Sequence, residues 1–243
     1  MRRAVSAKLV WRKETALRHF AGGLVSRLPG LLHGRTASGQ IRDGGAVTDV
    51  VDFAIDRLRQ AGVRLERGLG EAELERVQDR FGFEFCAVHR RPLSAVLPAG
   101  SERFPQNKWP DWRSGSDEDL RGRLNWPVEG VVFDVLNNGF WSASWGDRPA
   151  GAPEADAIAR EMVLSVPKMV PIFVHRYLPA APAPENPPVF SIYQTDVIYY
   201  GDDLVDYVAQ EFHVPPFHLN PVVGLRRVPF WSDLVDGAEV AQF

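Results

Sequence analysis

Three polar residues of this 243-residue chain could together perform acid/base chemistry. Asp134, His175 and Asp196 each lie in or beside a segment with β-strand composition. Two carboxylates and an imidazole are the groups with which hydrolases move protons. Their spacing does not require them to meet, and the residues also suit structural roles: Asp134 can accept from a turn amide, His175 can donate to a carbonyl, and Asp196 can close a turn.

The chain shows no spacing typical of a metal site or an activated nucleophile. Metal ligands usually come as near neighbours on one element, whereas the closest pair here, His213 and His218, is separated by two prolines without a third ligand nearby. The single cysteine, Cys86, can form no internal disulfide, and its apolar surroundings predict a buried structural thiol. We therefore expect no metal, no cofactor and no catalytic residue.

Composition predicts one main globular domain in a reducing compartment. Of the residues, 45% are apolar and 24% charged, so the chain can bury a sizeable core. No apolar stretch approaches the roughly 20 residues that cross a bilayer. We expect a cytoplasmic protein without membrane insertion.

The charge is unevenly distributed. Residues 1–45 contain nine Lys or Arg and two acidic residues, whereas the remainder contains 19 basic and 29 acidic residues. The first part therefore carries +7 and the rest −10. Residues 1–46 are predicted to form a disordered basic arm, because organised periodicity begins only near Val47. The arm has few interleaved aromatics, which disfavours nucleic acid, although binding of an anionic ligand through it stays open.

Helices are predicted in the first part of the domain. Apolar residues recur at helical spacing over Thr48–Ala61 and again from about Gly70 to Gly82. A third apolar segment, Phe83–Leu97, contains Pro92, which predicts a bent or two-part helix. A short helix is expected near Ser116–Leu124.

Strands and further helices follow. Val128–Val135 and Phe140–Trp145 flank Asn137-Asn138-Gly139, a combination that predicts a β-hairpin. The other expected elements are a helix over Pro153–Val166, a strand over Met169–His175 and a loop over Ala180–Pro188.

The segment Val189–Asp203 has the clearest secondary-structure pattern in the sequence. Two β-rich runs flank the polar trio Gln194-Thr195-Asp196, and Asp202 and Asp203 suit the start of a helix over Leu204–Phe212. Residues 213–243 are expected to be extended, with Phe230–Leu234 docking back on the domain. This order of elements predicts an α+β fold over 47–212, with a mostly antiparallel sheet packed with helices.

Aromatic residues are the candidates for partner binding. Five of the seven Trp cluster between Trp109 and Trp145, where burial of all of them is difficult, and rigid aromatics beside Arg are typical of binding hot spots. The predicted partner-binding residues are Trp109, Trp112, Trp141, Trp145, Arg148, Asp196, Tyr200, Asp202 and Asp203.

Four segments, about two thirds of the chain, resemble the SUKH superfamily, which joins cell-wall assembly regulators to bacterial toxin-immunity proteins. These segments are GLGEAELERVQDRFGFEF (68–85), LNWPVEGVVFDVLNNGFWSASWGDRPA (124–150), VPIFVHRYLPA (170–180) and NPPVFSIYQTDVIYYGDDLVDYVAQEF (186–212). The resemblance implies a single α+β domain that has no cofactor and binds proteins. Cys86–Arg91, Pro92 and the basic arm depart from the family pattern.

These observations favour a non-enzymatic protein-binding domain. The resemblance implies an immunity-type or regulatory protein that covers a partner such as a toxin, and the acidic domain suits a basic partner. The alternative is a hydrolase that uses Asp134, His175 and Asp196.

Overall fold

The computed structural model describes residues 46–214 and 226–237, all of which belong to one compact unit, Ile41–Phe243. The predicted basic arm, apart from Ala46, lies outside the described residues, as does His218. None of the described helices combines the length and apolar character needed to span a bilayer.

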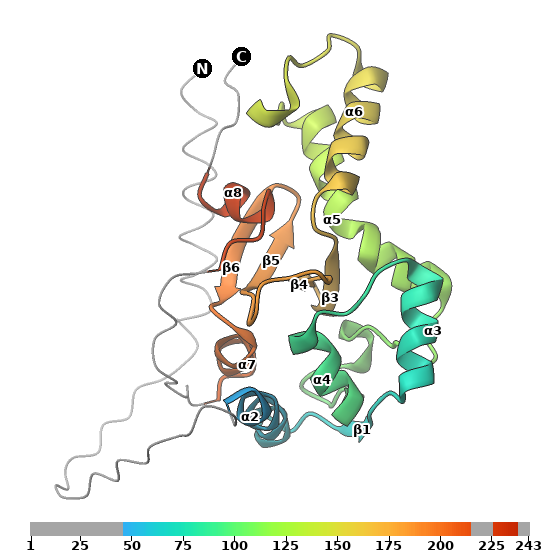
Figure 1. Ribbon diagram of the computed structural model, residues 1–243, viewed down its shortest axis with the longest axis vertical. Coiled ribbons are helices and arrows are strands. Elements are labelled where there is room, and N and C mark those ends of the chain that lie inside the picture. The colour runs from blue at the N-terminus through green and yellow to red at the C-terminus, as the bar shows by residue number, and fades with distance from the viewer. Residues whose placement is uncertain (1–45, 215–225, 238–243) are drawn as a thin grey trace, which may run out of the picture. The chain divides into compact units, whose positions relative to one another are not determined.

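The described residues form two antiparallel sheets. Figure 1 shows the larger one between the helices. The larger has the strand order β3-β4-β5-β6, and the smaller pairs β1 with β2. The strands are β1 (Leu65–Arg67), β2 (Val96–Pro98), β3 (Met169–Phe173), β4 (Arg176–Pro179), β5 (Val189–Tyr193) and β6 (Asp196–Gly201). The helices of the described part are α2 (Ala46–Gln60), α3 (Glu71–Phe81), α4 (Ala87–Ala95), α5 (Asp117–Asn137), α6 (Ala152–Ser165), α7 (Leu204–Phe212) and α8 (Trp231–Val235), with 3₁₀ turns at Gln106–Lys108 and Ala143–Trp145. The predicted α+β class with a mostly antiparallel sheet is confirmed.

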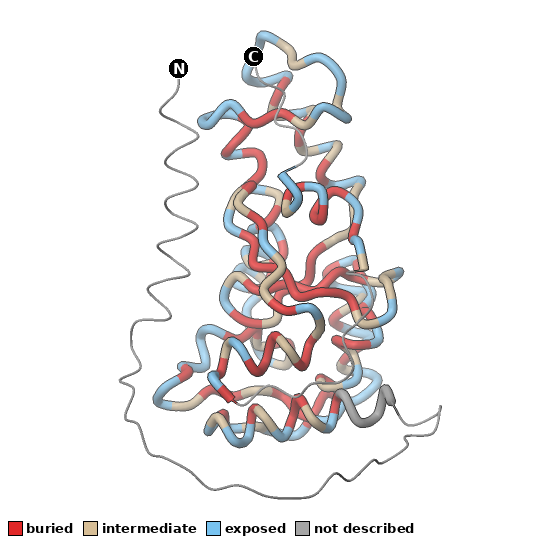
Figure 2. Tube along the Cα trace, turned by 90° about the vertical axis from the view of Figure 1, so that its left-hand side faces the viewer, coloured by how far each residue is buried: buried red, intermediate tan, exposed pale blue. Residues whose placement is uncertain are grey.

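The four-stranded sheet is covered on both faces, and β4 and β5 are buried along almost their whole length (Figure 2). Tyr177, Phe190 and Ile192 point to one face, where they share a core with residues of α5, α6 and α8. Leu178 and Val189 point to the other face, which packs against α2 and α7. Because side chains alternate along a strand, both faces of this sheet need apolar residues.

The predicted helices before residue 82 and after residue 150 are confirmed. Helix α3 begins after Gly70, whose N–H donates to the Glu73 carboxylate at 2.8 Å. It ends at Gly82, which adopts the left-handed conformation with φ 65° that favours glycine. Asp203 caps α7 by accepting from the amides of Val205 and Asp206 at 2.8 and 2.9 Å.

Pro92 does not break its helix. Helix α4 runs from Ala87 to Ala95 with Pro92 inside, so the predicted bent or two-part helix over Phe83–Leu97 is wrong. The segment is shorter than expected because Phe85 pairs with Ala180 in a β-bridge and Val96 already begins β2. Proline has a helical φ, so a nine-residue helix needs only to forgo one hydrogen bond.

The predicted hairpin over 128–145 is also wrong, because α5 continues through it. Val131, Val132 and Val135 are buried at helical spacing against the sheet and α6. Asn138 is the C-cap of α5 rather than part of a hairpin turn. Tertiary burial therefore outweighs the strand propensity of this Val-rich run.

Pro127 lies in the middle of α5 and cannot donate to the carbonyl of Arg123. The hydroxyl of Tyr177, on β4, donates to that carbonyl oxygen at 3.0 Å. A side chain of the sheet thus replaces the hydrogen bond that proline removes from the helix.

Helix α5 also meets the turn between β5 and β6, a junction that we call the α5–hairpin contact. A Cβ atom at Gly130 would lie 2.8 Å from Cα of Gln194, so only glycine permits this approach. One turn further, the carboxylate of Asp134 accepts from the amide of Thr195 at 2.9 Å and from its hydroxyl. The contact fixes the hairpin turn on the helix.

On the opposite face an ion pair joins the sheet to α7. Arg176 donates to Glu211 at 2.8 Å and to the hydroxyl of Ser191 at 2.7 Å. Its guanidinium lies 3.6 Å from the centre of the Tyr200 ring. With its donors engaged, this buried charge is compensated, which burial requires.

We expect Gly130→Ala to destabilise the protein by about 1–3 kcal/mol, because the new methyl group would overlap the backbone of Gln194. The matched control is Gly122→Ala on the same helix, where nothing lies within 4 Å of the added Cβ. That variant should be neutral or stabilising by up to about 1 kcal/mol, since Ala favours helix. Urea denaturation measures the unfolding free energy of each variant. Equal effects of the two variants would contradict the α5–hairpin contact.

We expect Tyr177→Phe to destabilise the protein by about 1 kcal/mol, because the Arg123 carbonyl loses its donor. In a Pro127→Ala background the new amide can donate to the same carbonyl, so the cost of Tyr177→Phe should shrink. A double-mutant cycle of unfolding free energies measures this coupling. Additive effects would contradict the proposed compensation.

Candidate functional site

Two of the three predicted acid/base residues, Asp134 and Asp196, lie beside the β5–β6 turn. Both carboxylate oxygens of Asp134 are engaged, one by Thr195 and the other by the side-chain amide of Asn138. His175 lies in the β3–β4 turn, where burial, and then the neighbouring Arg176, lower its pKa to about 4. Asp196 pairs in register with Tyr193 beside the β5–β6 turn. Within the described ranges, no three His, Cys, Asp or Glu side chains are grouped so that they could hold a metal ion.

Three of the four tryptophans predicted as surface anchors are buried. Trp109, Trp112 and Trp141 are 5%, 2% and 0% exposed, so the expectation that they reach the surface is wrong. Trp109 stacks on Phe212, with centroids 5.6 Å apart. The loop that carries Trp109 and Trp112 folds inward because each ring fills a gap between packed elements, which buries more apolar area than exposure would.

Trp145 and Arg148 both make contacts within the domain. Trp145 is half-buried and stacks on Phe230, with centroids 6.0 Å apart. Arg148 donates to the carbonyl of Val135 at 2.6 Å and so satisfies one of the free carbonyls in the last turn of the helix. Neither side chain stands free as an anchor.

The predicted residues near β6 are divided between structure and surface. Tyr200 covers Arg176, and Asp203 caps α7. Asp202 is exposed; partial burial, Asp206 and Asp203 raise its pKa. Of this group, only Asp202 clearly presents its carboxylate to solvent.

The exposed aromatic side chains lie elsewhere. Trp126, Phe133 and Tyr193 are 47%, 47% and 48% exposed, and Ile198 is 38% exposed. The rings of Trp126 and Tyr193 are 6.1 Å apart. We call these four residues the α5–hairpin surface.

The α5–hairpin contact holds this surface together. Gln194 lies over Gly130, midway between Trp126 and Phe133 on the helix. These two residues are two turns apart, about 10 Å along the axis. Ile198 lies diagonally across from Tyr193 on the same face of the β5–β6 pair, within reach of a long side chain. The apolar groups thus flank a turn that the helix fixes.

The sequence contained a signal for this surface that the hairpin interpretation hid. Trp126 and Phe133 are seven residues apart, a spacing that places both on one face of a helix but on opposite faces of a strand. Once α5 is a helix, the two side chains point to the same side, away from Val131, Val132 and Val135.

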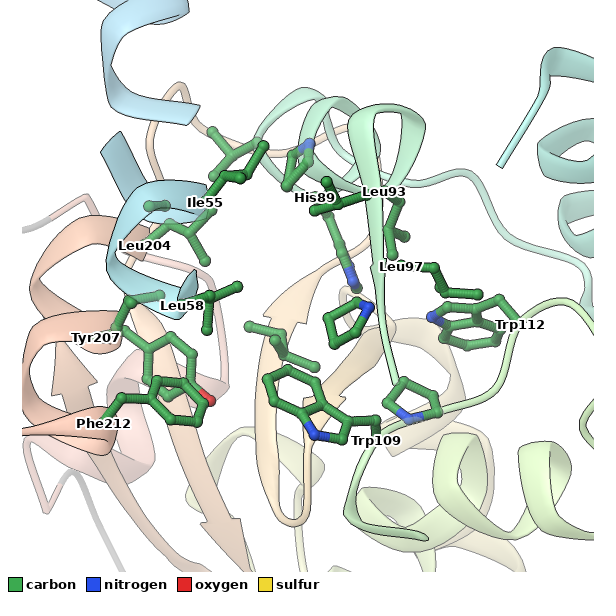
Figure 3. Close-up of a pocket in the computed structure, with 18 residues that line it drawn as sticks. Ile55, Leu58, His89, Leu93, Leu97, Trp109, Trp112, Leu204, Tyr207 and Phe212 are labelled. Carbon is green, nitrogen blue, oxygen red and sulfur yellow. The ribbon is translucent and has the colours of Figure 1, made fainter. Parts of the chain in front are cut away.

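A second feature is an internal pocket between α2, α4 and α7 (Figure 3). Trp109 and Trp112 belong to its lining, together with His89 and Tyr207. Burial lowers the pKa of His89 to about 3, so its imidazole is neutral at neutral pH.

Comparison of the chain with protein-family models, with curated proteins and with solved structures finds no match.

His89 should make the protein less stable in acid. Its pKa is lower in the folded state than the usual value of 6.5, so the unfolded state binds the extra proton. Stability is therefore full above pH 6.5 and falls below it, by up to about 1.4 kcal/mol per pH unit for this group. We expect His89→Leu to have a shallower loss of unfolding free energy between pH 6.5 and 4.5, as measured by urea denaturation.

The matched control is Leu93→Met in the same helix, which conserves volume and has no titrating group. The unfolding free energy of this variant should fall with decreasing pH as steeply as that of the unsubstituted protein. A His89→Leu protein with an unchanged slope would show that this histidine is not buried as a neutral group.

Proposed function

We propose that this chain is a non-enzymatic binding domain that covers another protein through the α5–hairpin surface. The observation that carries the proposal is the 6.1 Å approach of the exposed rings of Trp126 and Tyr193, with Phe133 exposed two turns further along α5 and Ile198 exposed on β6. Rigid, exposed aromatic side chains supply much of the binding energy at protein interfaces.

The ordered backbone that carries these side chains supports this proposal. Trp126 and Phe133 project from the long helix α5. Tyr193 lies at the β5–β6 turn, where the carboxylate of Asp134 accepts a hydrogen bond from the amide of Thr195. A surface that is already ordered loses little conformational freedom on binding, so more of the buried area contributes to affinity. Isolated apolar side chains are common on surfaces, whereas neighbouring ones, such as the rings of Trp126 and Tyr193, suggest an interaction site.

The proposed partner is a protein with a basic surface around an apolar recess. After residue 45 the chain carries −10, and opposite charge accelerates the encounter of two proteins. The resemblance to SUKH proteins supports an immunity-type or regulatory role in the cytoplasm, in which a toxin or another enzyme is occluded. In this mechanism the domain blocks a site by covering it.

The hydrolase alternative receives no support from the position of Asp134. A general base needs an oxygen that can reach substrate. Both oxygens of this 3% exposed carboxylate are occupied by hydrogen bonds that hold the hairpin and the end of α5.

The test begins with capture of partners from the host lysate on the full chain, followed by purification of each captured protein and measurement of its Kd. We expect Trp126→Ala and Tyr193→Ala each to weaken binding about 10- to 100-fold, since truncation of a hot-spot residue typically has this effect. Their unfolding free energies should change little, because both side chains are about half exposed.

Leu164→Ala is the matched control. Leu164 is 69% exposed and lies on α6, outside the α5–hairpin surface. Its loss should leave Kd unchanged, which separates recognition from general apolar adhesion. A partner that binds all three variants as tightly as the unsubstituted chain would overturn the proposed surface.

A further inference from the structure

The internal pocket has the lining of a small-molecule site. Its cavity volume is about 60 Å³, and the pocket opens in part to solvent. Figure 3 shows Ile55, Leu58 and Tyr207 on one side and Leu93 and Trp112 on the other. None of the lining side chains carries an acidic, lysine or arginine group. A mostly apolar cavity with a few convergent polar groups has the character of a small-molecule site.

Besides Nε1 of Trp109, which also borders a second pocket, three buried polar atoms of this lining have no hydrogen-bond partner among the described residues. They are Nδ1 of His89, Nε1 of Trp112 and the hydroxyl oxygen of Tyr207. The residues are 4%, 2% and 1% exposed, so solvent does not readily satisfy these atoms. Nearly all buried polar groups in native proteins find a partner, and three unpaired groups around one cavity are therefore unusual.

The other tryptophans show that pairing is the norm in this protein. Nε1 of Trp141 donates to the carbonyl of Gly146 at 2.8 Å, and Nε1 of Trp231 donates to that of Pro167 at 2.7 Å. Trp109 also lacks an indole partner in the described part, but it lines a second, more polar pocket as well. The unpaired atoms that belong to this pocket alone are therefore those of His89, Trp112 and Tyr207.

The chemistry of these groups specifies the complementary molecule. An indole N–H only donates, so Trp112 requires an acceptor, and its nitrogen faces the interior of the pocket in Figure 3. A tyrosine hydroxyl and a neutral imidazole can each donate or accept. No cation of the lining compensates an anion, and burial of an unpaired charge is strongly unfavourable.

We propose that this pocket binds a neutral, mostly hydrocarbon molecule that carries a carbonyl-type oxygen. The oxygen accepts from the indole N–H of Trp112, while the apolar walls contributed by α2, α4 and α7 enclose the hydrocarbon part. Tyr207 and His89 provide further polar contacts on other sides of the same cavity.

Three probes of similar shape test the proposal on the full chain. Acetophenone has the required carbonyl, ethylbenzene lacks an acceptor, and benzoate carries a negative charge. We expect acetophenone to bind about tenfold more tightly than ethylbenzene, which corresponds to one hydrogen bond, and benzoate to bind most weakly. Calorimetry measures the affinities, and ¹H–¹⁵N spectra should show a shift of the Trp112 indole signal with acetophenone.

Variants assign the preference to the pocket. Trp112→Phe and Tyr207→Phe keep an aromatic ring but remove the unpaired polar atom. Trp112→Phe should bring acetophenone and ethylbenzene to similar affinity, and Tyr207→Phe should leave the ligand-free protein at least as stable, because an unsatisfied buried group is removed. Trp231→Phe is the matched control, since its indole N–H already has a partner, and it should retain the tenfold preference.

Three outcomes would overturn the proposal. One is equal affinity of the unsubstituted chain for acetophenone and ethylbenzene, which would describe an apolar cavity without polar recognition. Another is the absence of binding by all three probes. The third is a preference for acetophenone that persists in Trp112→Phe.

Discussion

The junction between helix α5 and the β5–β6 turn is the constraint on which the other features depend. It combines close backbone approach at Gly130 with hydrogen bonds from Thr195 to the buried carboxylate of Asp134. A glycine alone would allow the approach without fixing it, and a carboxylate alone could not reach the turn across a larger side chain. Together they align α5, the longest helix of the described residues, with the hairpin, and α5 contributes to the core on that face of the sheet.

Most of the strong polar groups in this domain maintain the fold. Asp134 holds the β5–β6 turn, and Arg176 and Glu211 join the sheet to α7. Tyr177 donates the hydrogen bond that Pro127 cannot make within α5. Asp134, Arg176 and Tyr177 are buried and Glu211 is partly buried, and all four side chains are paired, as the cost of desolvation requires. The groups that remain for recognition are of two other kinds: the exposed aromatics of the α5–hairpin surface and the unpaired polar atoms of the internal pocket. Both kinds suit binding, one to a large apolar surface and the other to a small neutral molecule.

Several elements could be predicted because their signals are local. Gly70, Gly82 and Asp203 mark helix ends through backbone conformation and capping, and the β5–β6 hairpin follows from two β-rich runs around a polar turn. The errors arose where a local preference met a tertiary partner. The Val-rich run at 128–135 has strand propensity, yet α5 persists there because burial of one helical face against the sheet stabilises it more. Pro92 predicted a break, although a proline can stay in a helix when its missing hydrogen bond is tolerated, as at Pro92, or replaced from outside, as at Pro127.

By itself the sequence determined the fold class, the positions of most helices and strands after residue 150, and the absence of a recognisable metal-ligand or nucleophile motif, since composition, periodicity and caps act over a few residues. Only the tertiary structure decided which aromatics are exposed. Trp112 and Trp126 belong to the same aromatic-rich window, but one is 2% and the other 47% exposed. A side chain's burial depends on residues that are distant in the chain, such as Phe85 beside Trp112 and Tyr193 beside Trp126, and neither neighbour is encoded in local spacing.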